Sequence, residues 1–467
     1  MDISCFNKKL SHVLSKDTPL NRISLEALLA VIPRIDQLAD VPEGHTVLIR
    51  SDLDTPLTNN EVQDLSRLES IVKTIEYSLS RKWTVILFGH IGRDKNNTLR
   101  PVCIALSSLL KKEIQFIADW IDEQSYSVKQ EAADRIRSAS PGTIFMLENT
   151  RKYQIECAPW KVDPDTFHDT SKAMYKLSED IMTRLSDVEI NEAIAASNLD
   201  YSSCSLPLLM KRTGLGFFID SEMKTHINNV RKANMVVFSG LKIDKLDDLQ
   251  GIIEREHLKR IISAGSLAMA LRKGAAQLMG QDFCIGLAES DKTKKYFIED
   301  KRIEQAKHII QKCRQKEIEL ILPVDFILDN GVVSKEIPPD RAQMDIGPET
   351  IRLFRKVLHN YINESKASAQ QYVFFYNGVF GKFEDPRYEQ GTREFIGMLR
   401  DLTRSGIATY AGGGEGRLAL LKYGALGDVT HSFTSGGTVL KSLTNNHIGY
   451  LKSLYLQNYA DPEILAY

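Results

Sequence analysis

The chain has 467 residues, more than the roughly 100–200 residues of one ordinary domain, and this length predicts about two to four domains. Apolar residues make up 43% of the sequence, which excludes a disordered or fibrous protein. The 60 lysine and arginine residues nearly balance the 61 aspartate and glutamate residues, so no net field favours nucleic acid or a membrane as a partner. We therefore expect a globular protein that binds anions only locally.

The N-terminal sequence and the cysteines predict a soluble, cytoplasmic protein. No apolar stretch follows the first lysines, and no run of about 18 apolar residues occurs in the chain. The six cysteines lie far apart, without a C-x-x-C pair or a histidine at the spacing of a zinc site. We interpret them as buried free thiols.

The segment 10–41 contains an apolar stripe at helical spacing, made by Leu25, Leu28, Leu29, Ile32 and Ile35. Such a stripe usually faces the core of its own domain, and this is the interpretation we favour. A partner protein docked on the same stripe is the alternative. The tyrosines of the final segment, Tyr450, Tyr455 and Tyr459, are likewise interpreted as packing residues.

Short β-branched or aromatic runs recur along the rest of the chain, separated by amphipathic helical patterns. One such helix is predicted to begin at Asp64, with Asp64 as its N-cap residue. Strands that are apolar throughout and alternate with helices indicate parallel sheets covered on both faces. The fold class is therefore α/β. The predicted strands lie in residues 46–54, 83–92, 142–151, 235–242, 320–328, 372–381 and 407–414.

Charged side chains follow the strands in the first half of the chain. They are Asp52, Asp54, His90, Arg93 and Arg151. Ligand groups in parallel sheets gather where strands end, and arginines from separate strands can hold one phosphate or carboxylate between them. The alternative is that each arginine pairs with a surface carboxylate.

The second half of the chain has glycine turns at the ends of its strands. Gly412, Gly413 and Gly414 precede Glu415, and Gly436 and Gly437 lie in a second turn, before helical patterns. Glycines let backbone amides approach phosphate, and helix N-termini favour anions. With Lys242, Asn377 and Glu384 at other strand ends, these turns indicate a nucleotide site, although no Walker motif is present.

Taken in order, these motifs resemble those of the phosphoglycerate kinase family from about residue 46 to residue 443. VLIRSDLDTPL (47–57), FGHIGR (88–93) and LENTRKY (147–153) are similar to the family's VLVRVDFNVPL, SHLGRP and LENLRFH. SGLKIDK, LPVDFIL, MDIGPETI, YNGVFGKFE, AGGGEG and HSFTSGG then stand in the family's order. The resemblance thus covers most of the chain.

The resemblance implies two Rossmann-like lobes, with parallel sheets flanked by helices, hinged around a central cleft. It places an N-terminal extension at 1–41, an acid-substrate lobe at 42–219 with 438–467, an interlobe helix at 220–234 and a nucleotide lobe at 235–437. The implied glycolytic reaction moves a phosphoryl group between ATP and the carboxylate of 3-phosphoglycerate or a related acid, with ATP/ADP as co-substrate and Mg²⁺ as cofactor. A monomer is expected.

Residue roles are carried over by position. Arg67 would hold the reacting carboxylate, and Lys242 would offset charge on the moving phosphoryl group, with the amides of Gly436 and Gly437. The acid would be bound by Asp52, Asp54, His90, Arg93 and Arg151. The nucleotide would be bound by Lys245, Asn377, Glu384, Gly412, Gly413 and Gly414, and Mg²⁺ by Glu415.

Departures from the family pattern concentrate on the acid side. The chain reads NEAIAASNLDY (191–201) where the family has NDAFGTAHRAH, so Leu199 replaces an arginine and Tyr201 a histidine. Asp54 replaces an asparagine, an anion in place of an amide. These changes leave three alternatives open. The protein binds 3-phosphoglycerate more weakly, it acts on a different and less anionic acid, or it binds nucleotide without catalysis. A cation such as Lys211 or Arg212 in the place of Leu199 would favour the ordinary substrate.

On the nucleotide side, Ser435 replaces a glycine in a turn where a positive φ would be costly for serine. Glu415 stands where the family has aspartate and retains a carboxylate for Mg²⁺.

Overall fold

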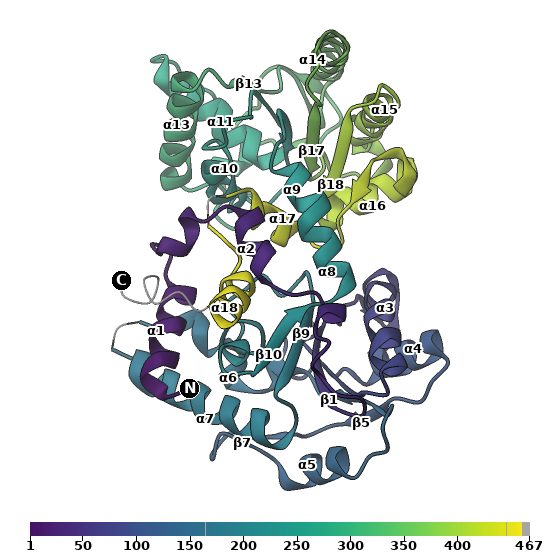
Figure 1. The fold of residues 1–467 in the computed structure, drawn as a ribbon. Coiled ribbons are helices and arrows are strands. Elements are labelled where there is room, and N and C mark those ends of the chain that lie inside the picture. The colour runs from purple at the N-terminus through teal and green to yellow at the C-terminus, as the bar shows by residue number, and fades with distance from the viewer. Residues whose placement is uncertain (164, 445, 460–467) are drawn as a thin grey trace. The chain divides into compact units, whose positions relative to one another are not determined.

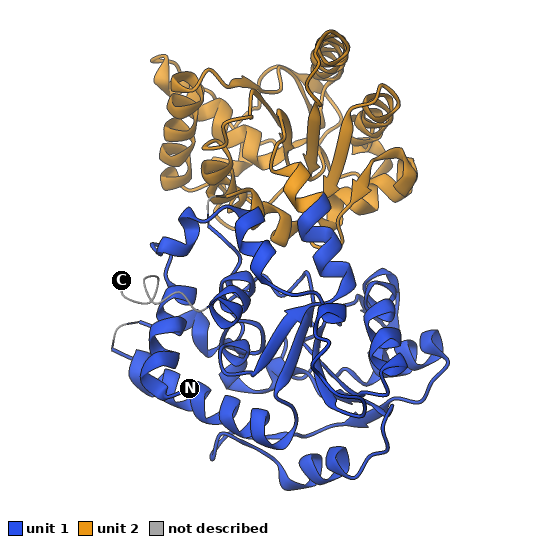
Figure 2. Cartoon of the chain, viewed as in Figure 1, with its two compact units in different colours: residues 1–225, 446–467 blue, residues 226–445 orange. Residues whose placement is uncertain are grey.

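The computed structural model describes residues 1–163, 165–444 and 446–459. They form two compact units, residues 1–225 with 446–467 and residues 226–445, coloured separately in Figure 2. The chain passes from unit 1 to unit 2 within a helical stretch made of α8 (Phe217–Ser221), a π-helical segment Glu222–Ile227 and α9 (Asn228–Val230). The domain boundaries inferred from the sequence stay a prediction.

Unit 1 is built on a six-stranded sheet in which every neighbouring pair is parallel (Figure 1). Its central strand is fully buried except at its first residue, because helices cover both faces. In spatial order the strands are β10 (Arg212–Leu215), β9 (Val188–Glu192), β1 (Thr46–Ser51), β4 (Thr84–Phe88), β8 (Ile144–Leu147) and β5 (Gln115–Ile117). Two hairpins add β2 (Leu57–Thr58) with β3 (Glu61–Val62), and β6 (Ile121–Asp122) with β7 (Ser127–Val128).

The helices of unit 1 bury apolar faces against this sheet. Leu68, Ile71 and Ile75 of α3, for example, pack into one core with Val47 and Trp83. The helices are α1 (Ile3–Leu14), α2 (Leu25–Val31), α3 (Ser66–Ser80), α4 (Arg100–Leu110), α5 (Gln130–Arg137), α6 (Gln154–Cys157), α7 (Phe167–Arg184), α8 and α18 (Gly449–Asn458).

Unit 2 repeats the same design with a second six-stranded, all-parallel sheet. Its order is β13 (Glu319–Ile321), β12 (Arg260–Ser263), β11 (Met235–Phe238), β17 (Val373–Asn377), β18 (Ala408–Gly412) and β19 (His431–Ser432). A three-stranded antiparallel sheet contains β14 (Phe326–Leu328), β15 (Val333–Ser334) and β16 (Gln343–Ile346). The predicted α/β class is therefore confirmed.

The helices of unit 2 surround an aromatic core in which Phe395 contacts both Phe374 and Phe380. They are α9, α10 (Lys245–Ile252), α11 (Gly265–Leu278), α12 (Leu287–Ser290), α13 (Asp300–Gln315), α14 (Pro348–Ala367), α15 (Gln390–Arg404), α16 (Gly414–Tyr423) and α17 (Gly436–Leu443).

The apolar stripe of the N-terminal segment is buried inside unit 1. Leu28 and Ile35 are fully buried, and Leu25, Leu29 and Ile32 are at most 3% exposed. This burial favours packing on the chain's own unit over a docking surface for a partner. Tyr450 and Tyr455 are buried as predicted, whereas Tyr459 is 40% exposed and does not fit the packing interpretation.

One local prediction is wrong: α3 begins at Ser66 and its N-cap residue is Leu65, not Asp64. The Asp64 carboxylate nevertheless accepts a hydrogen bond from the Ser66 amide at 2.8 Å, so it still satisfies a free amide at the start of the helix. All six cysteines are free thiols, of which Cys103, Cys204 and Cys313 are buried and the others half-buried.

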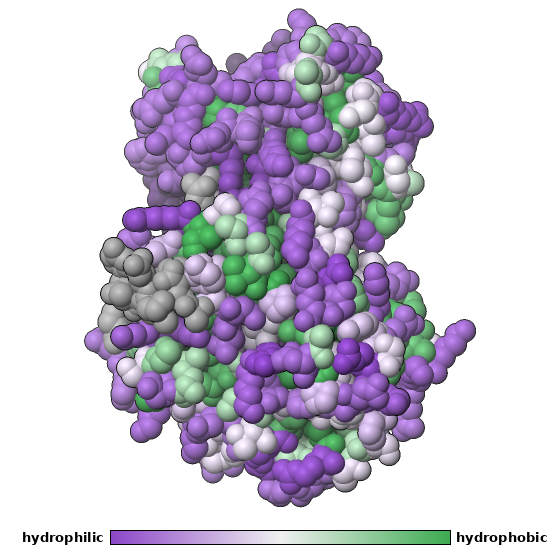
Figure 3. All heavy atoms as spheres, viewed as in Figure 1, coloured by the Kyte–Doolittle hydropathy of each residue, from purple (hydrophilic) through white to green (hydrophobic). Residues whose placement is uncertain are grey.

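Hydrophilic residues dominate the visible face of each unit, and smaller hydrophobic areas are scattered among these residues (Figure 3). Among the described residues, no helix combines the length and the apolar character needed to cross a membrane.

Candidate functional sites

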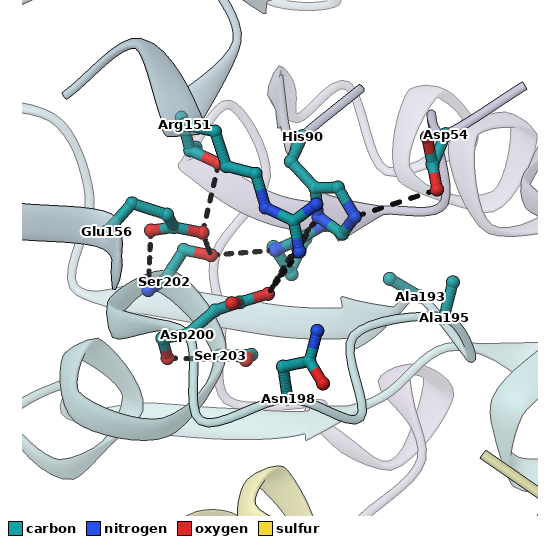
Figure 4. Close-up of polar contacts among 12 residues, drawn as sticks. Asp54, His90, Arg151, Glu156, Ala193, Ala195, Asn198, Asp200, Ser202 and Ser203 are labelled. Atoms are coloured by element: carbon teal, nitrogen blue, oxygen red, sulfur yellow. Dashed lines mark hydrogen bonds and ion pairs between the residues drawn. The ribbon is translucent and has the colours of Figure 1, made fainter. Parts of the chain in front are cut away.

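In unit 1, the predicted acid-binding residues follow three adjacent strands of the parallel sheet. Asp52 and Asp54 come after β1, His90 after β4 and Arg151 after β8. Because parallel strands end at one edge of a sheet, these side chains are expected to gather there. Figure 4 shows three of them, Asp54, His90 and Arg151.

A buried cluster of charges forms at this edge, and sequence reasoning missed two of its members. Arg50, at the end of β1, is 1% exposed and donates a hydrogen bond to His90 Nδ1 at 2.9 Å. Asp200 is fully buried, and its Oδ2 lies 3.8 Å from the nearest nitrogen of Arg50, of His90 and of Arg151. Figure 4 shows the Asp200 carboxylate directed at this group. We call Arg50, His90, Arg151 and Asp200 the buried charge cluster.

The hydrogen bonds of the cluster determine the protonation state of His90. A guanidinium can only donate, so Nδ1 of His90 must accept from Arg50, and an imidazole with an acceptor nitrogen is neutral. Burial, reinforced by the charges of Arg50, Arg151 and Arg67, lowers the pKa of His90 well below its usual value. The cationic groups of the cluster at neutral pH are therefore the two arginines.

Arg67 is held by the two carboxylates that follow β1. Its Nη1 lies 3.5 Å from Asp52 Oδ1 and 3.4 Å from Asp54 Oδ2, and it donates to the Asp54 carbonyl oxygen. The Asp54 side chain also accepts from the Gly92 amide at 2.7 Å. Burial raises the pKa of Asp52, although Arg67 opposes the shift. The carboxylate at position 54 thus offsets part of the positive charge of Arg67.

Glu156 and Ser202 support the cluster from α6 and from the segment after β9. Ser202 Oγ accepts from Arg50 Nε at 2.8 Å and donates to Glu156 at 2.6 Å. Burial, and next the charge of Asp200, raise the pKa of Glu156. One sequence signal was available for this network: Arg50 interrupts an apolar strand, and a charge in a buried strand needs a partner.

Arg93 and Leu199 lie outside the cluster. Arg93 is exposed. A Cβ placed on Gly449 would lie 2.8 Å from Leu199 Cδ2, so Leu199 packs against the start of α18. Lys211 and Arg212 do not take the place of the missing arginine, because they pair with Asp187 and Asp40 and are more than half exposed.

In unit 2, a cavity of about 520 Å³ opens at the carboxyl edge of the sheet. Glu384 and Glu415 line it, together with Gly240, Gly265 and Ser266. Apolar walls come from Met269, Ile285, Val379 and Phe380. A mostly apolar cavity of this size with a few polar groups is typical of a small-ligand site.

Lys245 and Glu415 reach the same point of the cavity wall. A Cβ on Gly240 would lie 3.2 Å from Lys245 Nζ and 3.3 Å from Glu415 Oε2, and the φ of Gly240 is +117°. Lys245 also donates to the Ser239 carbonyl at 2.8 Å. Burial lowers the pKa of Lys245, and the opposite charge of Glu415 limits this effect. Glycine at position 240 therefore lets a cation and a carboxylate meet at the cavity.

The other predicted nucleotide-side residues lie at neighbouring strand ends. Asn377 ends β17 and donates to the Gly412 carbonyl at 3.1 Å. Gly413, with a φ of +92°, precedes the first residue of α16, Gly414. Lys242 is exposed in the loop after β11, close enough for its charge to lower the pKa of Lys245.

Ser435 does not have the strained conformation considered from the sequence. Its φ is −128°, in the extended region that serine adopts freely, and its hydroxyl lies 2.9 Å from that of Thr438. The expected cost of replacing glycine here is therefore absent. Gly436 is the demanding position, since a Cβ there would lie 2.3 Å from Gly413 Cα.

Replacing Gly436 by alanine is expected to push the two glycine turns apart and weaken ATP binding by at least about tenfold, because backbone at 2.3 Å cannot give way cheaply. Gly437→Ala is the matched control, since a Cβ there meets nothing within 4 Å. Titration calorimetry with ATP and Mg²⁺ measures both affinities. Equal affinities in the two variants would contradict the close-approach argument.

The residues at the cavity fit Mg²⁺. Glu415 supplies an oxygen ligand, and this metal commonly takes one or two protein carboxylates and completes its shell with water and substrate phosphates. The nearby cation, Lys245, suits the same phosphates.

Sequence reasoning missed the junction of β12 with α11. Gly265, with a φ of +63°, brings the start of α11 against Gly240, and the Ser266 amide donates to the Gly240 carbonyl at 3.1 Å. The signal was a third strand–glycine–helix junction, Ser263-Ala264-Gly265-Ser266, of the kind recognised at 412–414.

The fold and these sites define an α/β protein with ligand groups at the strand ends of two parallel sheets. A family model described as phosphoglycerate kinase matches residues 36–446. The chain belongs to the phosphoglycerate kinase family, a family of kinases.

Individual relatives are distant but span nearly the whole chain. A phosphoglycerate kinase of Thermosipho africanus is 27% identical over 431 residues, 88% of this chain and 95% of that protein. One of Staphylococcus aureus is 28% identical over 432 residues, 88% and 96% of the two chains. Solved phosphoglycerate kinases of Coxiella burnetii and Pyrococcus horikoshii share the fold with TM-scores of 0.66 and 0.68, each at 22% identity. They cover 91% and 90% of this chain, and 98% of each solved chain is matched.

Proposed function

We propose that the chain moves a phosphoryl group between ATP and the carboxylate of 3-phosphoglycerate or a related acid, forming an acyl phosphate. The observation that carries this proposal is the meeting of Lys245 and Glu415 at the glycine-lined cavity of unit 2, in a chain of this family. A cation and a metal-binding carboxylate at one point suit a nucleotide polyphosphate.

In unit 2, Lys245 contacts the nucleotide phosphates, and Asn377 and the glycines 412–414 present polar groups beside them. Glu384 lines the cavity and accepts hydrogen bonds from the ribose. Mg²⁺ held by Glu415 supplies neutralising charge to the phosphates. Lys242 stabilises the phosphoryl group in flight, and the amides of Gly436 and Gly437 donate to it, so unit 2 provides alignment and charge neutralisation.

In unit 1, Arg67 orients the reacting carboxylate. Its position between Asp52 and Asp54 supports this role, because both carboxylates hold the guanidinium in place. The remaining predicted acid-binding residues are His90, Arg93 and Arg151. Only Arg93 is exposed, and the charge cluster already engages the other two.

A second candidate function is nucleotide binding without catalysis. Leu199 in the place of an arginine motivates it, since the two cations considered as replacements, Lys211 and Arg212, pair with Asp187 and Asp40 instead. Binding of ATP by itself requires only the unit 2 groups.

The two functions differ in turnover. ADP release is measured with ATP, Mg²⁺ and a panel of carboxylic acids that includes 3-phosphoglycerate, and ATP binding is measured in parallel by calorimetry. We expect ATP binding and acid-dependent ADP release. Binding without release on any acid would support the non-catalytic alternative, and no ATP binding would contradict both.

A further inference from the structure

The segment after β9 carries a charge reversal at the strand edge. Residues 198–201 read Asn-Leu-Asp-Tyr, where the family pattern has His-Arg-Ala-His. The three basic side chains that the pattern places here are thus replaced, by Asn198, Leu199 and Tyr201, and an acidic one, Asp200, is added. The structure shows where this acid goes.

Asp200 lies beside two residues that were expected to bind a substrate anion, His90 and Arg151. One carboxylate oxygen, Oδ1, accepts from the indole nitrogen of Trp160 at 3.1 Å. The other, Oδ2, faces Arg50, His90 and Arg151, with 3.8 Å to each (Figure 4). An anionic oxygen of the chain itself therefore lies against two of the residues that were predicted to bind the substrate, His90 and Arg151, and against the buried guanidinium of Arg50.

Other contacts within the chain also fix the orientation of the two arginines of the cluster. Arg151 donates to the Gly92 carbonyl at 2.7 Å, and its guanidinium lies 5.3 Å from the centre of the Trp160 ring. Arg50 donates to the Ser51 carbonyl and to Ser202. With His90 neutral and two arginines facing the acids Asp200 and Glu156, little positive charge is left for a dianion.

We propose that Asp200 is a specificity-determining residue: its carboxylate takes the place of a substrate phosphate, so the acid bound by unit 1 is a monocarboxylic acid with an uncharged tail. The existence of an acid substrate rests on the proposed function. The exclusion of phosphate does not, because it follows from the side chains of unit 1.

Asp200→Asn removes the charge and keeps the shape, and Asp200→Ser opens more space. Both variants are expected to gain binding of 3-phosphoglycerate and of inorganic phosphate by about 10–100-fold in calorimetry, the value of one or more charge-assisted hydrogen bonds. Asp187→Asn is the matched control, because this carboxylate of unit 1 precedes β9 and lies at the opposite end of that strand. Its phosphate affinity should equal that of the unchanged protein.

The unchanged protein is tested with glycerate and 3-phosphoglycerate, two acids that differ only in the phosphate. We expect glycerate to support more ADP release. Faster turnover of 3-phosphoglycerate, or no gain of phosphate binding in a variant whose thermal unfolding shows it to be folded, would overturn the inference. If the unchanged protein does not bind ATP, this result would instead count against the proposed function, since the proposed ATP site lies in unit 2.

Discussion

Lys242→Ala is expected to lower the rate of phosphoryl transfer by about 10²–10³-fold, the usual cost of removing one group that stabilises a transition-state charge. Lys242 is exposed after β11, whereas Lys245 is half-buried and donates to the Ser239 carbonyl at the cavity wall. Lys245 and Glu415 remain in the variant, so ATP affinity should change little. The effect should therefore lie in kcat and not in KM for ATP.

The measurement compares ADP release, with the acid that gives the highest turnover, and calorimetric ATP binding in the same preparations. Lys259→Ala is the control, since Lys259 is an exposed lysine directly before β12, at the other end of the unit 2 sheet. It should leave both quantities unchanged. An equal loss of ATP affinity and of turnover in Lys242→Ala would show that Lys242 acts in binding and not in the transfer step.

Arg50→Met is expected to lower the free energy of unfolding by about 3–5 kcal/mol, because removing one partner of a buried ionic network leaves the others uncompensated. Asp200 would retain Arg151 but lose the guanidinium 3.8 Å away, and Ser202 would lose the hydrogen bond from Arg50 Nε. Methionine approximates the length of the arginine stem, so the cavity contribution is small.

Urea unfolding measures this loss. Arg93→Met is the matched control, because Arg93 is an exposed arginine that follows a strand of the same sheet. This substitution should change the free energy of unfolding by less than about 0.5 kcal/mol. The double variant Arg50→Met with Asp200→Asn should recover part of the loss, since it removes the orphaned charge as well. Additive effects of the two substitutions would show that Arg50 and Asp200 are not coupled.

The α/β class was predictable because its signal is local. Strands apolar throughout, such as 83–92, alternate with amphipathic helices, and only a parallel sheet buried on both faces suits that pattern. The N-cap of α3 was misplaced by one residue because the Asp64 carboxylate satisfies a helix amide from outside the helix, a choice that local preference does not determine.

The positions of the glycine turns in unit 2 were predictable for a related reason. Glycine turns after strands, at 412–414 and 436–437, leave a mark in the sequence because the backbone there needs space or a positive φ. Position 240 has the same requirement, but the reason becomes visible only when Lys245 and Glu415 are seen within 3.3 Å of the point where its Cβ would lie. The serine at 435 shows the limit of the rule, since its φ is negative.

By itself, the sequence determined that this chain is an α/β protein with the motifs of a kinase family, and that an arginine is missing at position 199. Only the tertiary structure decided which groups neutralise the remaining arginines of unit 1. Arg50 and Asp200 are 150 residues apart in the numbering, and nothing in their local sequence states that they meet, because electrostatic pairing depends on distance in space. Folding brings that carboxylate to the arginines and so turns an expected anion site into one that the chain neutralises itself.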